Sequence, residues 1–213
     1  MLVKPFEITL YSKLRLFFEQ HGFVLMADKK QFRKVTSRGF QNVIFTATSY
    51  DDEIWLEVNF GIRNNQIEQI AQQFLGNTRD FWNESNTIVV SIGKYNDAKY
   101  FRYKIMTEPD IEDVSDIVKD FLILDGFPFL KVSDNLLALN EIFNKFPKKP
   151  CKYVYNQVHR SFKGIINAKL INDENFLDLT DKHREKLISI GATHEELLTF
   201  ERLLSFLLYH SPN

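Results

Sequence analysis

Cysteine and glycine are both scarce in this sequence. The single cysteine, Cys151, excludes an internal disulfide and favours the reducing cytoplasm as the location of the protein. Only 8 glycines occur, and none is arranged as Gly-x-Gly-x-x-Gly, as a P-loop or as Gly-x-Ser-x-Gly. The sequence therefore does not predict a phosphate-binding loop or the nucleophile turn of a serine hydrolase.

An excess of charge of one sign and a long hydrophobic run are also missing. The 27 Lys and Arg residues and the 28 Asp and Glu residues give a formal net charge of −1, so no global field attracts nucleic acid or a membrane. No apolar stretch approaches the roughly 20 residues of a membrane span. The first residues also lack the basic and apolar order of a secretory signal. We therefore expect no membrane partner, and nucleic acid is not the expected ligand.

The sequence does contain a clear hairpin pattern over residues 40–62. Apolar residues alternate with other residues on both sides of a turn at residues 50–53, where Asp51 and Asp52 favour a turn by bonding their own backbone. Closing the turn there predicts three apolar pairs on one face of the sheet: Val43 with Phe60, Phe45 with Val58, and Ala47 with Leu56.

Helices and further strands surround this hairpin in the first half of the chain. We predict a leading helix from Pro5 to Gly22, because proline suits a first turn and glycine suits a helix end. Asn64 and Asn65 are expected to cap a second helix that ends at Gly76. The other strands are predicted at residues 23–26, 31–36, 87–92 and 100–105.

The second half of the chain is predicted to be entirely helical. Gly126 and Pro128 are expected to end its first helix, and the last helix, over residues 197–209, is expected to be the most buried. This order indicates an α+β fold, with an N-terminal helix and an antiparallel meander sheet followed by helices. We predict a sheet domain over residues 1–106 and a helical region over residues 107–213, and both one compact unit and two domains remain open.

The residue types that carry chemistry are present but do not form a recognised site. The histidines are His21, His159, His183, His194 and His210. Their spacing, together with that of the acidic residues, completes no zinc site. Lysines flank Cys151 and could activate its thiol, but no histidine partner follows from the sequence. We therefore assign no catalytic residue, no cofactor and no metal ligand, and the sequence does not indicate an enzyme.

The open face of the hairpin is the first candidate for a binding site. An aromatic, an acid and an amide alternate there opposite two threonines. The residues are Trp55, Glu57, Asn59, Thr46 and Thr48. This mixture suits a polar small ligand or a partner chain. The alternative interpretation is that helices from the second half of the chain cover this face.

Charge is clustered locally despite the overall balance. An acidic run opens the first helix of the second half and is a candidate surface for a basic protein partner, although the helix dipole also favours acids there. The run includes Glu108, Glu112, Asp113 and Asp116. A basic hairpin contains Lys29, Lys30, Arg33, Lys34 and Arg38. It could bind phosphates, but protection of an exposed sheet edge is the favoured interpretation.

Three segments resemble a pattern of uncharacterised bacterial domain-of-unknown-function families. They are HGF at residues 21–23, QFRKV at residues 31–35 and WLEVNFGI at residues 55–62. The resemblance covers the first third of the chain and implies a leading helix with an antiparallel meander. Some of these families lie near toxin loci, which implies an immunity or interaction role. The expected function is therefore a protein–protein interaction module of immunity type. The alternative is a small-ligand-binding domain or enzyme that uses the face around Trp55.

Overall fold

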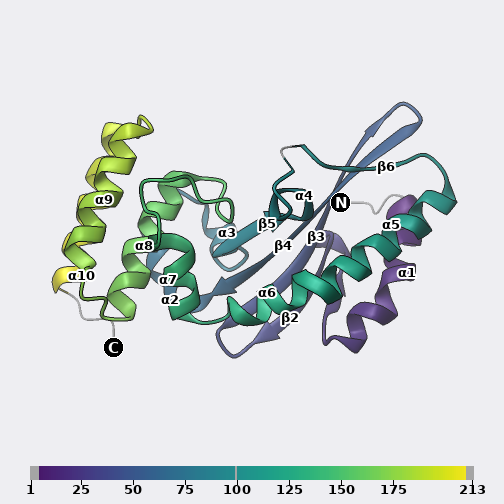
Figure 1. Cartoon of the computed structure of the whole chain (residues 1–213), viewed down its shortest axis with the longest axis horizontal. Coiled ribbons are helices and arrows are strands. Elements are labelled where there is room, and N and C mark those ends of the chain that lie inside the picture. Colours follow the sequence, from purple (N-terminus) through teal and green to yellow (C-terminus); the bar gives the residue numbers. More distant parts are fainter. Residues whose placement is uncertain (1–4, 99, 210–213) are drawn as a thin grey trace. The chain divides into compact units, whose positions relative to one another are not determined.

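A six-stranded sheet forms the centre of the first half of the chain in the computed structural model, which describes residues 5–98 and 100–209 (Figure 1). The strand order is β1-β2-β3-β4-β5, and β6 pairs with β4. The strands are β1 (Val24–Met26), β2 (Gln31–Thr36), β3 (Gly39–Tyr50), β4 (Glu53–Asn64), β5 (Ile88–Ser91) and β6 (Tyr103–Ile105). With a leading helix and a helical second half, the chain has the predicted α+β class.

The long hairpin of β3 and β4 turns at the predicted place. Asp51 adopts a left-handed conformation with a φ of 45°, which Asp tolerates better than most residues do. The predicted apolar face is buried at Val43, Phe45, Leu56, Val58 and Phe60, and Ala47, nearer the turn, is half-buried. Alternation along the two strands was therefore sufficient to predict which face meets the core.

Aromatic rings fill the space between this face and helix α1 (Pro5–Gln20). The rings of Phe18 and Phe32 stack with their centroids 4.0 Å apart. Tyr11 meets Phe32 and Phe45 edge-on, with 6.0 Å between ring centroids in both pairs. Stacked and edge-on arrangements are both favourable for aromatic pairs. Part of the high phenylalanine content, 20 residues in the whole chain, therefore packs a helix onto a sheet.

Helix α5 (Glu108–Phe121) lies beside α1, and its Phe121 ring is 5.3 Å from that of Phe60 on the sheet (Figure 1). The prediction that Gly126 and Pro128 end this helix is wrong. The chain continues through a π-helical turn (Leu122–Gly126) directly into α6 (Phe127–Val132). Because a π turn already interrupts the regular i→i−4 hydrogen bonds, a proline just after it costs less than one in a helix interior.

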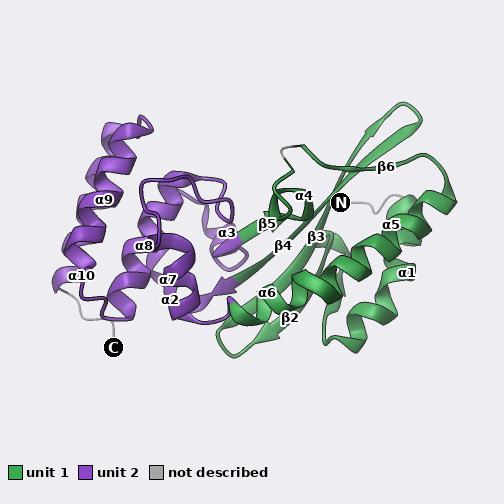
Figure 2. Cartoon of the chain, in the orientation of Figure 1, with its two compact units in different colours: residues 1–62, 89–132 green, residues 63–88, 133–213 purple. Residues whose placement is uncertain are grey.

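The secondary-structure elements group into two compact units (Figure 2). Unit 1 contains residues 1–62 and 89–132, including the short helix α4 (Ile92–Tyr95), and unit 2 contains residues 63–88 and 133–213. This grouping does not coincide with the predicted boundary at residue 106, because α5 packs on α1 and the segment between β4 and β5 belongs with the later helices. The helices of unit 2 are α2 (Asn65–Ala71), α3 (Arg79–Trp82), α7 (Leu136–Asn144), α8 (Gln157–Leu170), α9 (Phe176–Ser189) and α10 (His194–Tyr209).

Helix α8 is the most buried helix of unit 2. Every residue from Arg160 to Ala168 is buried, and the helix contacts α2, α7, α9 and α10. The prediction that the last helix would be the most buried is wrong. Helix α10 buries three large side chains, whereas Leu208 is 49% exposed. Leucines on several sides of a helix thus did not predict its burial, because α10 packs mainly on α8 and α9 and leaves Leu198 and Leu208 exposed.

Candidate functional site

The residues predicted for a ligand site lie together on the face of the sheet opposite the aromatic core. Those that are half-buried are Trp55, Glu57, Asn59 and Thr48, and the exposed one is Thr46. The indole N–H of Trp55 donates to a carboxylate oxygen of Glu53 at 3.2 Å. Lys104 of β6 also pairs with Glu53, and this hydrogen bond lowers the pKa of the Glu53 carboxyl. The five residues share one face, and their role in ligand binding stays a prediction.

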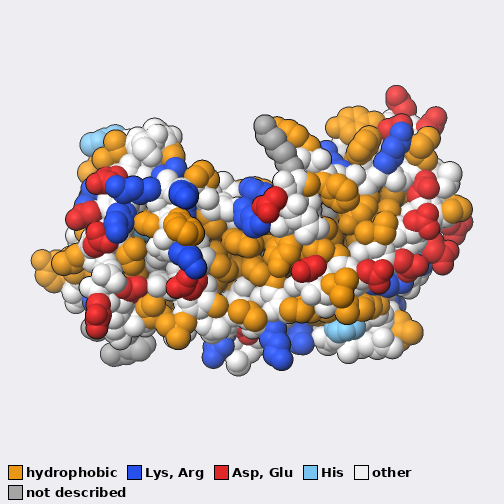
Figure 3. All heavy atoms as spheres, viewed as in Figure 1, with side chains coloured by type: hydrophobic (Ala, Val, Ile, Leu, Met, Phe, Trp, Pro, Cys, Tyr) orange, Lys and Arg blue, Asp and Glu red, His pale blue; other side chains and the backbone are white. Residues whose placement is uncertain are grey.

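The four acidic residues predicted for a partner face are all exposed on α5. They are Glu108, Glu112, Asp113 and Asp116. Figure 3 shows acidic side chains gathered over this helix. Glu112 forms an ion pair with Lys13 of α1 at 3.2 Å, and Asp116 forms one with Lys119 at 2.9 Å. Asp110 differs from them because it accepts two backbone N–H groups that precede the helix, which lowers its pKa and caps α5.

Residues of the basic hairpin make contacts within unit 1. Lys30 forms an ion pair of 2.6 Å with the buried carboxylate of Glu7. The guanidinium of Arg33 lies over the ring of Phe40, 3.9 Å from its centroid. The first contact joins the residue before β2 to α1, and the second joins β2 to β3, which favours a structural role over phosphate binding.

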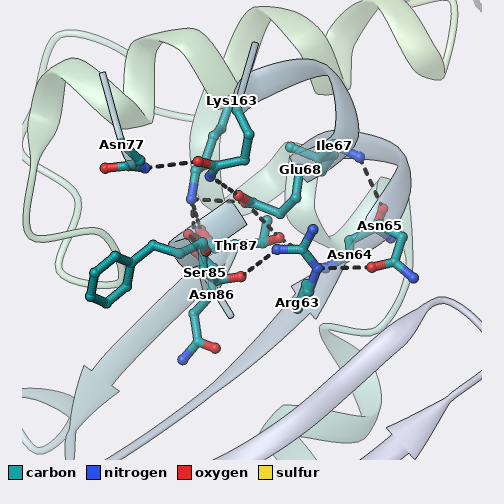
Figure 4. Close-up of polar contacts among 12 residues, drawn as sticks. Arg63, Asn64, Asn65, Ile67, Glu68, Asn77, Ser85, Asn86, Thr87 and Lys163 are labelled. Carbon is teal, nitrogen blue, oxygen red and sulfur yellow. Dashed lines mark hydrogen bonds and ion pairs between the residues drawn. The ribbon is translucent and has the colours of Figure 1, made fainter. Parts of the chain in front are cut away.

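Unit 2 contains a buried polar cluster that the sequence did not single out (Figure 4). Nζ of Lys163 on α8 lies 2.8 Å from Oε1 of Glu68 on α2, and the two side chains are 5% and 0% exposed. Lys163 also donates to the backbone carbonyl of Asn86 at 2.7 Å. Glu68 accepts from the Thr87 hydroxyl at 2.9 Å and from the Gln72 amide at 2.7 Å. These extra hydrogen bonds offset the cost of burying two charges.

The same cluster lies where strand β4 passes into helix α2 (Figure 4). Of the two residues predicted to cap α2, Asn64 is the cap, because its side-chain oxygen accepts two backbone N–H groups of the first turn. The backbone N–H of Asn64 donates to the Thr87 hydroxyl at 2.8 Å. Arg63 donates to the carbonyl of Ser85 and to the side-chain oxygen of Asn65, both at 2.9 Å. The junction between strand and helix is thus fixed by side chains from both segments.

A second polar network connects α7, α8 and α9. Nε2 of His183 lies 2.8 Å from Oδ1 of Asn144, and the amide nitrogen of Asn144 donates to Asn140 and to the carbonyl of Gly164. Because Oδ1 only accepts, His183 must donate from Nε2, which leaves Nδ1 as a buried lone pair without a partner among the described residues. Burial, and secondly the charge of Arg160, lower the pKa of His183 to about 3. The ring is therefore neutral at pH 7.

Arg160 organises the segment between α7 and α8. Its buried guanidinium donates to the backbone carbonyls of Phe143 at 2.7 Å and Phe146 at 2.9 Å, and to that of Lys149. Cys151 lies in this segment and is buried, and its thiol is 3.6 Å from a backbone carbonyl of α7. The lysines that flank Cys151 in the sequence therefore do not produce an exposed nucleophile.

A cavity of about 440 Å³ lies in unit 2 near the buried ion pair. It is lined by Phe74, Leu75, Gly76, Asn77, Val158, His159, Phe162, Thr193, Glu195, Glu196 and Thr199. His159 precedes Lys163 by one helical turn, and burial followed by the charge of Lys163 lowers the pKa of its ring. The backbone N–H of Thr193 donates to the Glu196 carboxylate at 2.7 Å, which fixes this acid at the cavity. The cavity thus combines apolar walls with oriented polar groups.

The sequence contained one signal that would have led to these residues. Helix α8 carries Arg160, Lys163 and Asn167 among apolar residues, and buried polar side chains need partners. His159 and Lys163 are also four positions apart, which places them on one side of a helix. Their partners, however, come from segments far away in the chain and could not be assigned from spacing.

No family model, no curated protein and no solved structure matches this chain. Within residues 5–98 and 100–209, no three His, Cys, Asp or Glu side chains come together as metal ligands would. His210 lies outside the described residues. Among the described helices, none has the length and apolar character needed to cross a membrane.

Proposed function

We propose that unit 1 is a protein-binding module whose partner docks on the outer face of α5. This face consists of Asp113, Asp116, Ile117 and Asp120, which are spaced by three, four and seven residues and so lie on one side of the helix. The observation that supports the proposal is the position of Ile117, which is 52% exposed between the carboxylates. The opposite side of α5 packs into the core of unit 1.

A partner for this face must be basic and must carry apolar side chains. The carboxylates would accelerate association and select a positive surface. Ile117, and Leu124 in the following π turn at 73% exposure, would supply apolar area to bury. The resemblance of the first third of the chain suggests a bacterial immunity-type role, in which the partner would be a toxin protein.

The test compares the chain with its charge-reversed variant Asp113→Lys/Asp116→Lys. Proteins captured from cells that naturally express the chain are identified, and the one that the variant loses is purified. Its affinity for both forms is then measured by calorimetry at several salt concentrations. We expect the variant to bind at least about tenfold more weakly, and binding of the natural chain to weaken with salt.

The matched control is Asp178→Lys/Asp181→Lys, which reverses two exposed acids on α9 of unit 2. This control should capture the same partner with unchanged affinity. If every captured protein binds both variants equally well, or if binding does not depend on salt, the outer face of α5 is not the docking surface.

A second candidate function is small-ligand binding on the face of the sheet around Trp55. The half-buried state of Trp55, Glu57 and Asn59 supports it, since side chains covered by a packed helix would be buried. The test is a change in tryptophan fluorescence on screening polar ligands, with Trp55→Phe to assign the signal. A signal that survives Trp55→Phe would come from elsewhere and would count against this face.

A further inference from the structure

The cavity of unit 2 has two chemically different sides. Phe74, Leu75, Val158 and Phe162 supply apolar and aromatic walls, and the remaining lining residues are mostly polar. Its volume of about 440 Å³ lies in the range of roughly 300–1,000 Å³ that is typical of small-molecule sites. Such a cavity suits an organic molecule with an apolar body and one polar end.

One polar residue of the lining, Asn77, is bonded to the buried network of Glu68 and Lys163. The side-chain amide of Asn77 donates to Oε1 of Gln72 at 2.9 Å, and Gln72 in turn donates to Glu68, the partner of Lys163. Figure 4 shows Asn77 and the Glu68–Lys163 pair within one connected group of polar contacts. The indole N–H of Trp82 donates to the carbonyl of Asn77 at 3.0 Å. A wall fixed in this way orients its groups before a ligand arrives.

The charge of the residues that line the cavity determines whether the polar end of a bound ligand should be positive or negative. Two carboxylates line the cavity, Glu195 and Glu196, and the cavity has no Lys or Arg in its lining. The positive charge of Lys163 is paired with Glu68. Burial, and secondly the charge of Lys163, lower the pKa of His159, which disfavours a positive charge on its ring. The lining therefore carries a formal charge of −2 and complements a cation.

We infer that this cavity binds a small organic amine, with its ammonium group at the carboxylates of Glu195 and Glu196 and its apolar body against Phe74 and Phe162. The aromatic walls favour an organic cation over a metal ion, since a metal would need oxygen or nitrogen ligands around it. This site belongs to unit 2 and is independent of the protein-binding surface proposed on α5.

The inference is tested with three probes of nearly the same shape, namely phenethylamine, phenethyl alcohol and 3-phenylpropionate. Each is titrated into the isotope-labelled full chain at pH 7, and amide chemical shifts are followed by NMR. We expect saturable shifts at the lining residues for the amine, with a Kd on the order of 1 mM. The neutral alcohol should bind at least about tenfold more weakly, and the anion more weakly still.

The variant Glu195→Gln/Glu196→Gln removes the two negative charges of the cavity while keeping side chains of nearly the same shape. Glutamine at position 196 keeps the hydrogen bonds that cap α10, so the fold is retained. We expect this variant to lose the preference for the amine over the alcohol. The control Glu174→Gln/Glu185→Gln removes two exposed acids of unit 2 that do not line the cavity, and it should bind the amine as the natural chain does.

Three results would each overturn the inference. They are the absence of saturable amine binding up to roughly 20 mM, equal binding of amine and alcohol by the natural chain, and unchanged amine binding by Glu195→Gln/Glu196→Gln. Shifts confined to residues outside the cavity would equally exclude this site. None of these results bears on the α5 surface, so the two proposals fail or stand separately.

Discussion

Lys163 and Glu68 form an ion pair of 2.8 Å that is almost completely shielded from water. Removal of one partner leaves the other charge buried without compensation. We therefore expect Lys163→Met to lower the free energy of unfolding by about 3–5 kcal/mol, although methionine fits the space of the lysine stem. Urea unfolding followed by circular dichroism measures this loss.

The exposed pair of Lys182 and Asp178 provides the control, because it also joins a lysine to a carboxylate, but at the surface of α9. Exposed ion pairs contribute about 0–1 kcal/mol, so Lys182→Met should unfold at nearly the same urea concentration as the natural chain. A Lys163→Met variant as stable as Lys182→Met would show that the buried pair is not a structural support.

His183 makes stability depend on pH. Its pKa is about 3 in the folded chain and about 6.5 in the unfolded chain, so acid protonates the unfolded form first. The neutral ring makes its full contribution to the free energy of unfolding above about pH 6.5. This contribution is lost progressively as the pH falls towards 3, at up to about 1.4 kcal/mol per pH unit. Urea unfolding midpoints measured across this range should show the decline.

The variant His183→Gln removes the titrating ring but keeps an N–H donor for Asn144. Its stability should therefore fall less steeply between pH 6.5 and 3 than that of the natural chain. His194→Gln, at an exposed position, is the control and should leave the slope unchanged. Parallel pH profiles for the natural chain and His183→Gln would contradict a buried neutral histidine.

Local patterns were sufficient to predict part of the secondary structure. Alternation in β3 and β4 identified the buried face, and Asn64 identified the start of α2, because each depends on residues that are neighbours in the chain. The same local reasoning failed at Pro128. There the π-helical turn before the proline, which no short sequence pattern encodes, lets the helical path continue.

The partners within the polar networks of unit 2 could not be predicted, for a different reason. From the sequence, Lys163 is expected to be a surface cation. It is buried only because α2 and the segment before β5 pack against α8. His183 is likewise expected from the sequence to be solvated, whereas in the fold it contacts Asn144 and lies close to Gly164. Burial and partnership arise from tertiary contacts between distant segments, and a single sequence reports only the residue types.

The Cα atom of Gly164 lies so close to Asn144 and His183 that no side chain fits between them. A Cβ atom there would lie 2.7 Å from Oδ1 of Asn144 and 2.7 Å from Nε2 of His183. Gly164→Ala should therefore destabilise the chain by about 1–3 kcal/mol through overpacking, even though alanine favours a helix interior by about 1 kcal/mol. Thermal or urea unfolding of the variant measures the balance.

Gly76 offers the matching control, because a Cβ atom there meets nothing within 4 Å. Gly76→Ala should be neutral, or should stabilise by up to about 1 kcal/mol through the unfolded chain. If Gly164→Ala proves as stable as Gly76→Ala, the side chains of Asn144 and His183 can move to accommodate a methyl group. The close packing at Gly164 would then not require a glycine.

Arg160 and Cys151 together allow a direct test of how the segment between α7 and α8 is held. Arg160→Lys keeps the charge but loses the planar fork that bonds the carbonyls of Phe143 and Phe146. The segment should then open more often, and the thiol of Cys151 should react with the chromogenic reagent DTNB about tenfold faster or more. Since Cys151 is the single cysteine of the chain, the absorbance change reports this segment alone.

Arg184→Lys is the control, because Arg184 bonds the exposed carboxylate of Glu201 on α10 rather than backbone carbonyls. Its thiol reactivity should equal that of the natural chain. Equal rates in Arg160→Lys and the natural chain would mean that Cys151 is protected by apolar packing alone. Fast labelling of all three proteins would mean that the segment opens without hindrance in solution. We expect the Cys151 thiol to react faster in Arg160→Lys only, because a lysine cannot form several hydrogen bonds to backbone carbonyls from one rigid group.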